Sequence, residues 1–280
     1  MIDLHCHSYF SDGILSPEDL IAKALQSNIQ ILALTDHDTV AGLEKFREAA
    51  RHHPIQIING IEFSTRWKKY DIHILGLNIN PESNQITTLI NQQTISRINR
   101  AQLISEKLKL CGIADAYEKA CAIAGHNRVG RPHLAQVIIK EGLAVDMQTA
   151  FKRYLARGKP AYVATPWISI PEAVEGIAAS GGQAVIAHPL KYKLTRTKLF
   201  ELITEFKEAG GVGLEVVSGE MTTTQIKEMT GLCIRYELLS STGSDFHGDT
   251  LSRISLGRQA QLPVNCMPVW HQWATKQGTL

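Results

Sequence analysis

The stretch that decides the fold lies near the start of the chain and reads Asp3-Leu4-His5-Cys6-His7-Ser8-Tyr9-Phe10-Ser11-Asp12. The residues from Met1 to Leu4 are apolar enough to form a buried strand. Because side chains alternate along an extended chain, His5 and His7 point to one face and Cys6 to the other. Two neighbouring imidazoles followed by a carboxylate at Asp12 are typical of a divalent metal site. An isolated His-x-His also fits two hydrogen-bonded histidines at a strand end, so the interpretation depends on the downstream pattern.

The composition is that of an ordinary globular protein. Of the 280 residues, 44% are hydrophobic and 20% are charged, which allows a substantial core in one α/β domain or one domain with an insertion. The net charge of +2 argues against a broad surface that coats nucleic acid. The cysteines form no Cys-x-x-Cys pair, and we see neither a signal sequence nor an apolar run of membrane length. We therefore expect a cytoplasmic protein with reduced thiols and no membrane association.

The first part of the chain alternates between strands and helices. A helix is expected after Ser16, a favourable N-cap residue that is followed by Pro17 at the first helical position. Buried strands are expected at residues 31–34 and 55–61, with a second helix between them. This order predicts parallel strands that are joined by right-handed crossovers.

A hairpin is expected after the third strand. Only ten residues separate Glu62, at the end of that strand, from His73, which begins the next one. A helical crossover needs a dozen or more residues, so the next strand is expected to be antiparallel. The start of an antiparallel strand lies beside the end of its neighbour. His73 should therefore lie at the same mouth as Glu62.

The sequence texture changes from about Glu82 onward. Residues 83–160 contain no convincing strand, and helices are expected at residues 86–110, 114–124, 132–140 and 147–157. Alternation then resumes, with helices at 171–180, 196–209 and 222–236 and strands at 184–187, at 212–217 and ending at 243. We therefore expect an α/β barrel formed by residues 1–82 and 161–280, with a small all-helical insertion formed by residues 83–160.

Side chains that bind metals follow the predicted strands one after another. They are His5, His7, Asp12, His37, Glu62, His73, His188, Asp245 and His247. Because catalytic groups of β/α barrels gather at the carboxyl-terminal rim, we expect a multinuclear metal site there. Outside this pattern, and expected on the surface, are His52, His53, His126 and His271.

This set of motifs resembles the PHP (polymerase and histidinol phosphatase) family. The motifs that carry the resemblance are His5-x-His7 with Asp12, Thr35-Asp36-His37, Gly60-x-Glu62, His73, Ala187-His188-Pro189 and Ser244-Asp245-x-His247. The resemblance covers residues 1–82 and 161–280. It implies a distorted (β/α)7 barrel that holds three divalent ions, usually manganese, iron or zinc.

The resemblance also implies how the ligands are shared. One ion would be held by His5, His7, Glu62 and Asp245, a second by Asp12, His37 and His247, and a third by Glu62, which bridges, with His73 and His188. Carboxylates and imidazoles without a thiolate suit manganese or iron as well as zinc. Manganese is our first expectation. The nucleophile would be a hydroxide generated on the metal, with no protein nucleophile.

Basic residues of the insertion indicate a phosphate substrate. Arg97 and Arg100 share a helix face, with Asn99 between them. Arg131 is expected at a helix N-cap shortly before His133, where free backbone amides favour anions. Solvated surface arginines are the alternative interpretation. Since a basic lid over a metal mouth suits a phosphate better than a carboxamide, we expect these five residues to bind substrate.

These segments, together with the stretch from Tyr154 to Lys159, resemble a particular PHP subgroup. It consists of 3′,5′-nucleoside bisphosphate phosphatases and includes 5′-to-3′ exoribonuclease activity. The resemblance implies a phosphoesterase that hydrolyses the 3′-phosphate of nucleoside 3′,5′-bisphosphates, removes 5′-mononucleotides from 5′-monophosphorylated RNA, or does both. Its partners would be nucleotides or short RNA 5′ ends, with no obligate protein partner.

Other interpretations stay open. Histidinol-phosphate phosphatase, or another small phosphomonoesterase, is the alternative within the family, and the arginines of the insertion argue against it. An amidohydrolase-type barrel also opens with His-x-His, but Asp12 and the final Asp-x-His motif favour PHP. A non-catalytic metal-binding partner domain is the third alternative. Near the mouth, Trp67 and Tyr70 fit either a base-stacking pair or a packed rim loop.

Overall fold

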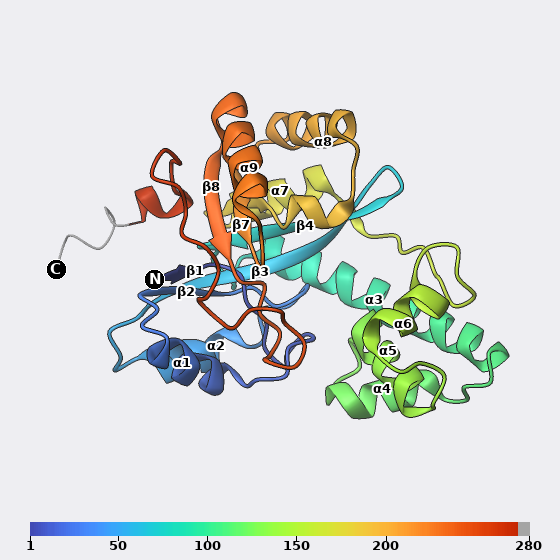
Figure 1. Ribbon diagram of the computed structural model, residues 1–280. Coiled ribbons are helices and arrows are strands. Elements are labelled where there is room, and N and C mark those ends of the chain that lie inside the picture. The colour runs from blue at the N-terminus through green and yellow to red at the C-terminus, as the bar shows by residue number, and fades with distance from the viewer. Residues whose placement is uncertain (274–280) are drawn as a thin grey trace.

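The structure, a computed structural model, describes residues 1–273 and is built around one mixed sheet (Figure 1). The seven strands along the sheet are, in spatial order, β1 (Ile2–Asp3), β2 (Ile31–Leu34), β3 (Gln56–Trp67), β4 (Tyr70–Leu77), β6 (Gln183–Ile186), β7 (Gly213–Ser218) and β8 (Leu239–Gly243). A further short strand, β5 (Ile168–Ser169), pairs with β3.

The sheet closes on itself because the end of β8 and the residues just after it pair with the residues that follow β1. The amide of Leu4 donates to the carbonyl of Thr242 at 3.0 Å, and the amide of Asp245 donates to the carbonyl of His5 at 2.8 Å. The strand pairs are parallel except for those of β4, which runs antiparallel to β3 and β6. The predicted distorted barrel and its hairpin are therefore confirmed.

Helices cover the outside of the barrel. They are α1 (Pro17–Gln26), α2 (Leu43–Ala50), α7 (Ile170–Ala179), α8 (Arg196–Glu208) and α9 (Thr223–Tyr236), with the short 3₁₀ helices η2 (Pro189–Tyr192) and η3 (Val269–Gln272) in the loops. The start of α1 follows the sequence prediction, because Ser16 Oγ accepts a hydrogen bond from the amide of Asp19 at 2.9 Å. Pro17 occupies the first helical turn, where its missing amide hydrogen costs nothing.

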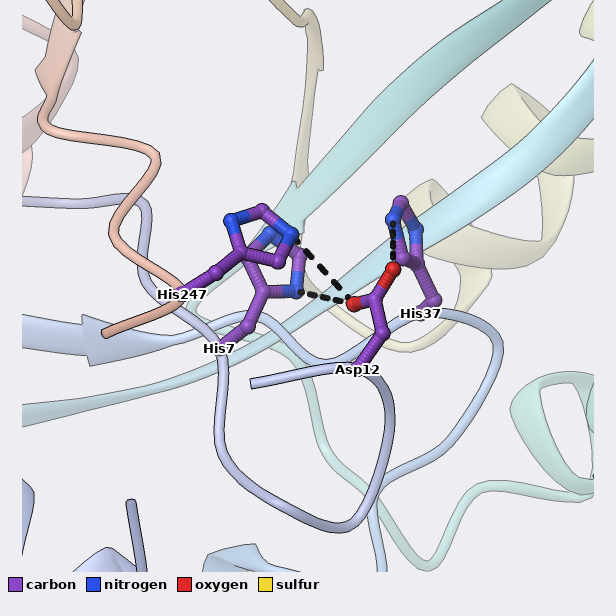
Figure 2. A group of neighbouring side chains, drawn as sticks. All are labelled: His7, Asp12, His37 and His247. Carbon is purple, nitrogen blue, oxygen red and sulfur yellow. Dashed lines mark ion pairs between the residues drawn. The ribbon is translucent and has the colours of Figure 1, made fainter. Parts of the chain in front are cut away.

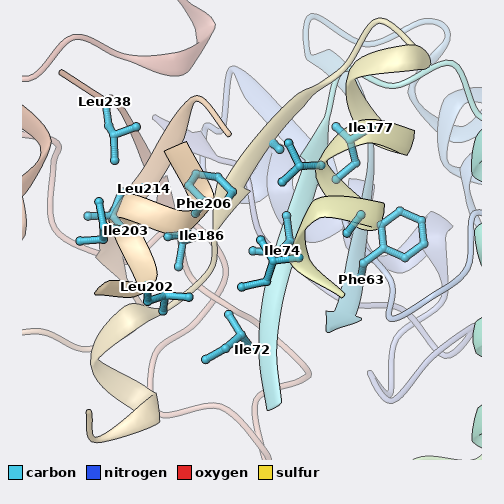
Figure 3. Packing of buried hydrophobic residues seen from close by; sticks show 14 of the residues in the cluster. Phe63, Ile72, Ile74, Ile177, Ile186, Leu202, Ile203, Phe206, Leu214 and Leu238 are labelled. Atoms are coloured by element: carbon cyan, nitrogen blue, oxygen red, sulfur yellow. The ribbon is translucent and has the colours of Figure 1, made fainter. Parts of the chain in front are cut away.

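Alternation along the strands separates an apolar outer face from an inner face that is polar at the mouth and apolar further along, where Leu75, Leu77 and Val185 pack in a cluster of their own. Phe63 on β3 and Ile72 and Ile74 on β4 pack outward in one cluster with apolar residues of α7 and α8 (Figure 3). Glu62 directly precedes Phe63 and His73 lies between Ile72 and Ile74, so both side chains point into the barrel. The same alternation that builds the core thus places the two candidate ligands inside.

The β3–β4 hairpin is longer than the sequence indicated. The strand does not end at Glu62, as we expected, but continues to Trp67, which pairs directly with Tyr70. Backbone pairing continues through these residues because their outward side chains still find apolar neighbours. The tight turn is formed by Lys68 and Lys69, with Lys68 at a positive φ of 51°. Strand β5 was also missed, since two residues are too few to show a periodicity.

The insertion is entirely helical. It contains α3 (Asn84–Leu110), α4 (Ala116–Ala124), α5 (Arg131–Lys140), α6 (Met147–Ala150) and the π-helical turn η1 (Phe151–Leu155). These helices share a hydrophobic cluster of their own, which includes Ile104, Leu108 and Leu134. Figure 1 shows α4, α5 and α6 beside the barrel, with α3 extending from one to the other. This separate cluster supports our proposal that residues 83–160 form a distinct domain.

Within residues 1–273, none of the helices combines the length and the apolar character needed to cross a membrane.

Gly243, at the end of β8, provides a test of how the barrel closes. A Cβ atom there would lie 2.3 Å from His5 Cβ and 2.9 Å from the His5 amide nitrogen. Because both atoms belong to the buried His5, whose backbone is hydrogen-bonded to the segment after β8, we expect Gly243→Ala to lower the free energy of unfolding by about 1–3 kcal/mol. Gly231→Ala is the matched control. It lies in α9 with no atom within 4 Å of the new methyl, and it should stabilise by about 0.5–1 kcal/mol. Chemical denaturation of both variants measures the difference.

Candidate metal centre and arginine pocket

The candidate ligands reach one mouth of the barrel from separate elements. His5 and His7 follow β1, Asp12 lies on the next loop, and His37 follows β2. The remaining ligands are Glu62 in β3, His73 in β4, His188 after β6, and Asp245 and His247 after β8. The ligands with fully or almost fully buried side chains include His5, His7, Glu62, His188 and Asp245. The structure thus brings together all nine of the ligands predicted from the sequence.

The carboxylate of Glu62 lies at the centre of this group. Its Oε1 atom is 2.9 Å from both His73 Nδ1 and His188 Nε2. Its Oε2 atom lies within 3.3 Å of ring nitrogens of three further histidines, His5, His7 and His37. One fully buried carboxylate therefore contacts five imidazoles, which fits a bridging ligand.

The first group of donor atoms has the spacing of a metal coordination shell. His5 Nε2 and His7 Nε2 are 3.1 Å apart, and Asp245 Oδ1 lies 3.4 and 3.3 Å from them. Ligand atoms held tetrahedrally at ~2.1 Å from an ion would be about 3.4 Å apart. At this distance the two nitrogens can share one proton in an N–H···N hydrogen bond, and a cation bound to both would replace that proton and accept both lone pairs.

A second group surrounds Asp12 (Figure 2). Asp12 Oδ1 lies 3.3 Å from His247 Nε2, and Asp12 Oδ2 lies 3.7 Å from His37 Nε2. His7 Nδ1, at 4.0 Å from Asp12 Oδ1, adds a residue that the resemblance assigned only to the first group. Around Glu62 the donor atoms fall into two groups, one with His5 and His188 and one with His37 and His73, whereas the resemblance implied a single group of Glu62, His73 and His188.

Buried polar atoms without hydrogen bonds give an independent sign of a cation site. Within residues 1–273, Asp12 Oδ1, His37 Nδ1 and Glu62 Oε2 are buried and lack a hydrogen-bond partner. His37 Nδ1 and Glu62 Oε2 are only 2.9 Å apart but do not have hydrogen-bond geometry. Leaving such groups buried and unpaired is costly. The donor set therefore fits divalent metal ions, and its mixture of carboxylates and imidazoles suits manganese, iron or zinc.

The electrostatics keep the acidic ligands in the ionised form that binds metal. Burial alone would raise the pKa of Glu62, but the imidazoles of His37, His73 and His5 hold it well below its usual range. Burial would lower the pKa of His247, whereas the carboxylate of Asp12 raises it to about 9. Burial also lowers the pKa of His7 to about 3, so this ring is neutral and its nitrogens can act as ligands.

Glu215 is a functional residue that the sequence analysis missed. It lies in β7, is fully buried, and its Oε1 is 3.0 Å from His5 Nδ1. Its Oε2 accepts a hydrogen bond from the amide of His188 at 2.6 Å. A carboxylate that holds the second nitrogen of a metal-binding imidazole fixes its tautomer and orientation. The signal in the sequence was a single acidic residue inside an otherwise apolar strand.

A second missed carboxylate, that of Asp36, supports the loop that carries Asp12. It accepts hydrogen bonds from the amide and hydroxyl of Ser8 at 2.8 and 2.6 Å and from the hydroxyl of Ser11 at 2.6 Å. Burial raises the pKa of Asp36 to about 6. The Thr35-Asp36-His37 motif therefore supplies one candidate ligand, His37, and one residue that anchors the loop, Asp36.

A second feature of the mouth, which we call the arginine pocket, is a cavity of about 140 Å³ between the ligands and the insertion. Its basic residues are Arg97, Arg100 and Arg131, and the ligands Asp12, His37 and His73 also line it. Arg100 is 5% exposed and stacks on Trp167, with its guanidinium 4.5 Å from the ring centre. Burial, reinforced by the charges of Arg97 and Arg131, holds the pKa of Arg100 well below its usual range.

The three arginines differ in how they are paired. Arg97 Nε donates to Asp38 Oδ2 at 2.6 Å, and its guanidinium also donates to Ser64 Oγ at 2.9 Å. A guanidinium nitrogen of Arg131 lies 3.6 Å from Asp71 Oδ2. Among the described residues, Arg100 has no hydrogen-bond or ion-pair partner within bonding distance. Its buried charge is therefore available to an anion.

The structure corrects several details of the predicted substrate site. The N-cap of α5 is Gly130 rather than Arg131, because the extended backbone that a cap requires falls at the glycine. His133 Nδ1 accepts a hydrogen bond from the amide of Gly130 at 3.0 Å and thus caps the helix. Burial lowers the pKa of His133 to about 4. Asn99 is exposed on α3 and is not among the residues of the arginine pocket.

The histidines outside the ligand set and the tip of the β3–β4 hairpin can also be compared with the sequence predictions. His52, His53 and His271 are exposed as predicted, but His126 is half-buried, because its ring packs edge-on against His133. The hairpin tip is a packed rim rather than a base-stacking pair. Trp67 is buried, and its ring nitrogen donates to Glu205 Oε2 at 2.5 Å.

The fold is a mixed barrel, and imidazoles and ionised carboxylates converge at its mouth in groups that could each hold a metal ion. These two features define a barrel-type, metal-dependent hydrolase. The chain belongs to the PHP domain family of metal-dependent phosphoesterases, because the family's PHP domain model matches residues 3–156 and close relatives match nearly the whole chain. The resemblance seen in the sequence is therefore confirmed.

Similar proteins give this family membership more detail. A protein of Haemophilus influenzae named 5′-3′ exoribonuclease is 41% identical, covering 97% of this chain and 98% of the relative. A 3′,5′-nucleoside bisphosphate phosphatase of Chromobacterium violaceum is 37% identical, covering 97% of this chain and 95% of the relative. A solved structure from C. violaceum, described as an amidohydrolase with bound sulfate and no metal, superimposes with a TM-score of 0.93. It is 36% identical and covers 98% of this chain and 96% of that one.

Glu215→Gln tests whether the newly found carboxylate tunes the candidate ligands. Because the substitution keeps the shape but removes the charge that holds His5, we expect metal affinity to fall by roughly 10–100-fold. Competition with a chromophoric chelator measures the change. Glu237→Gln, at a side chain that is 87% exposed, is the control and should leave metal affinity unchanged. Equal affinities in the two variants would contradict the assigned role.

Proposed function

We infer that the chain hydrolyses the 3′-phosphate of nucleoside 3′,5′-bisphosphates, removes 5′-mononucleotides from 5′-monophosphorylated RNA, or does both. The observation that carries this proposal is the buried, unpaired guanidinium of Arg100 in a cavity that it shares with three candidate metal ligands. A second anion-binding region beside the reaction centre suits a substrate with two phosphate groups. The names of the two relatives from H. influenzae and C. violaceum support the same substrates.

The proposed cofactor is three divalent ions, with manganese first and iron or zinc as alternatives. Donor groups around Asp245, Asp12 and Glu62 would each hold one ion. When bound, such ions lower the pKa of water and neutralise oxygens on an in-line phosphoryl centre. The chain itself contributes the bridging carboxylate of Glu62, which keeps neighbouring cations from repelling one another.

The layout of the mouth determines which phosphate would be cleaved. If Arg100 and Arg131 hold the 5′-phosphate, the group attached to the 3′ oxygen faces the ligand cluster. Hydrolysis then joins a water oxygen to that phosphorus and breaks its bond to the 3′ oxygen, which takes up a proton and leaves as the ribose hydroxyl. A bisphosphate yields a 5′-monophosphate. RNA yields a 5′-mononucleotide and a shortened chain with a new 5′-phosphate.

The cellular setting is also proposed. All five cysteines are free, which is consistent with the reducing cytoplasm that we expected from the sequence. Nucleotides and RNA 5′ ends, the substrates proposed above, are found in that compartment.

The proposed anchor makes a direct prediction about RNA substrates. RNA with a 5′-phosphate should be degraded from its 5′ end much faster than the same RNA with a 5′-hydroxyl, because only the former engages the arginine pocket. Time courses with labelled RNA and added manganese measure both rates. Histidinol phosphate, the substrate of the alternative function within the family, is assayed in parallel. Equal rates on the two RNAs, or digestion from the 3′ end, would show that the anchor is wrongly placed.

Metal content tests the proposed cofactor. We expect two to three divalent ions per chain in protein purified without chelator, since nine ligands exceed what one ion accepts. Glu62→Gln should lose more metal than His188→Gln, because Glu62 contacts five imidazoles whereas His188 is a terminal ligand. Elemental analysis of folded protein gives both results. Repeated preparations of folded wild-type protein with one ion or none would contradict the three-ion proposal.

Substitutions in the arginine pocket should weaken substrate binding and spare metal content. Charge-assisted contacts of this kind are worth roughly 1.5–3 kcal/mol, so Arg100→Ala and Arg131→Ala should each lower kcat/KM by roughly 10–100-fold. Asn99→Ala is the control on the same helix, and we expect nearly wild-type kinetics because this side chain faces solvent. Unchanged kinetics in both arginine variants would return these residues to a structural role.

A further inference from the structure

A second, larger cavity opens at the other end of the ligand cluster. It measures about 530 Å³, which is within the ~300–1,000 Å³ of typical ligand sites. His188, Asp245 and His247 line it, whereas Asp12, His37 and His73 line the arginine pocket, so the two cavities share no candidate ligand. Figure 2 shows His247 and His37 on opposite sides of Asp12. We call this second cavity the Lys193 cavity.

The Lys193 cavity carries an excess of positive charge from two separate loops. Lys191 and Lys193 come from the loop after β6, and Arg253 comes from the loop after β8, against two acids, Glu220 and Asp245. Lys191 pairs with Asp245, and Arg253 lies 3.5 Å from Glu220 in a pair that is exposed to solvent and therefore weak. Among the described residues, the ammonium group of Lys193 has no hydrogen-bond or ion-pair partner. Two cationic side chains at this rim can therefore accept a phosphate group.

The rest of the lining is a mixture of polar and apolar groups. Ser218 is 7% exposed, and its hydroxyl is buried without a hydrogen-bond partner among the described residues. A buried hydroxyl in this state is destabilising unless a ligand or water satisfies it. Met221 and Leu251 add apolar surface, and Leu251 is 37% exposed. A cationic rim that follows the phosphates is the electrostatic part of a single-strand binding site. Here Met221 and Leu251, rather than aromatic rings, supply the apolar surface for a base.

We propose that the Lys193 cavity binds the RNA chain on the 3′ side of the cleaved linkage, that is, the second nucleotide and its following phosphate. The inference rests on the function proposed above. If the first nucleotide is anchored in the arginine pocket, the remaining chain must leave the reacting phosphorus from the opposite side, where this cavity begins at His188, Asp245 and His247. A nucleoside bisphosphate has no group that reaches it. The cavity therefore serves RNA alone.

A double variant of the cavity rim tests the proposal. Lys193→Ala with Arg253→Ala removes two positive charges without altering a candidate metal ligand. The control, Lys227→Ala with Arg258→Ala, removes the same charge from exposed positions that do not line the cavity. Each phosphate contact is worth roughly tenfold in affinity. We expect kcat/KM on a short 5′-phosphorylated RNA to fall by about tenfold or more in the rim variant only. Its kcat/KM on adenosine 3′,5′-bisphosphate should stay at the wild-type level, which also shows that it is folded.

Salt dependence gives a second measurement. Removing phosphate contacts should flatten the dependence of RNA kcat/KM on salt concentration in the rim variant relative to the control. Equal RNA kinetics in the two double variants would overturn the inference, and so would an equal loss on RNA and bisphosphate, which would place the first nucleotide in this cavity. If the wild-type protein hydrolysed the bisphosphate but not RNA, the inference would be overturned and the phosphatase proposal would stay intact. A wild-type protein inactive on both substrates would overturn the proposed function itself.

Discussion

The structure depends on a single buried carboxylate, that of Glu62, surrounded by five imidazoles. A fully buried anion is tolerated only where partners offset its lost hydration, and here the five partners come from four separate parts of the chain, since only His5 and His7 are neighbours in the sequence. The strands that deliver the five histidines must therefore converge at fixed positions. The closure of β8 onto β1 and the antiparallel hairpin both serve this convergence.

A second carboxylate, that of Asp38, ties the insertion to the barrel. It accepts hydrogen bonds from Arg97 and Gln93 of α3 and from the backbone amide of Ser64 in β3. The same side chain therefore fixes a helix of the insertion, a strand of the barrel and the base of the arginine pocket. This arrangement explains why Arg97 is better understood as positioning the pocket, while Arg100 remains the free cation within it.

Much of this structure could be predicted from the sequence because the strands are strongly apolar and several ligands follow them directly. His5, His37, His188 and Asp245 each stand just after a buried run, which is a local signal. Contacts between residues far apart in the chain leave no such local signal in the sequence. The continuation of β3 beyond Glu62, the role of Glu215 and the burial of His126 depend on neighbours far away in the chain. The N-cap of α5 was assigned one residue too late, because Gly130 carries no side chain that announces a cap.

The long helix α3 belongs to both hydrophobic cores. Its first half packs against α7 and β5, and its second half carries Ile104 and Leu108 into the core of the insertion. Its 27 residues form a rod about 40 Å long. Arg97 and Arg100 lie near the middle of this rod, where it is held from both ends. A hinged opening of the insertion would therefore require α3 to bend or one of the two cores to unpack. The two cores thus brace the helix that carries the arginines, much as a beam is held at both ends.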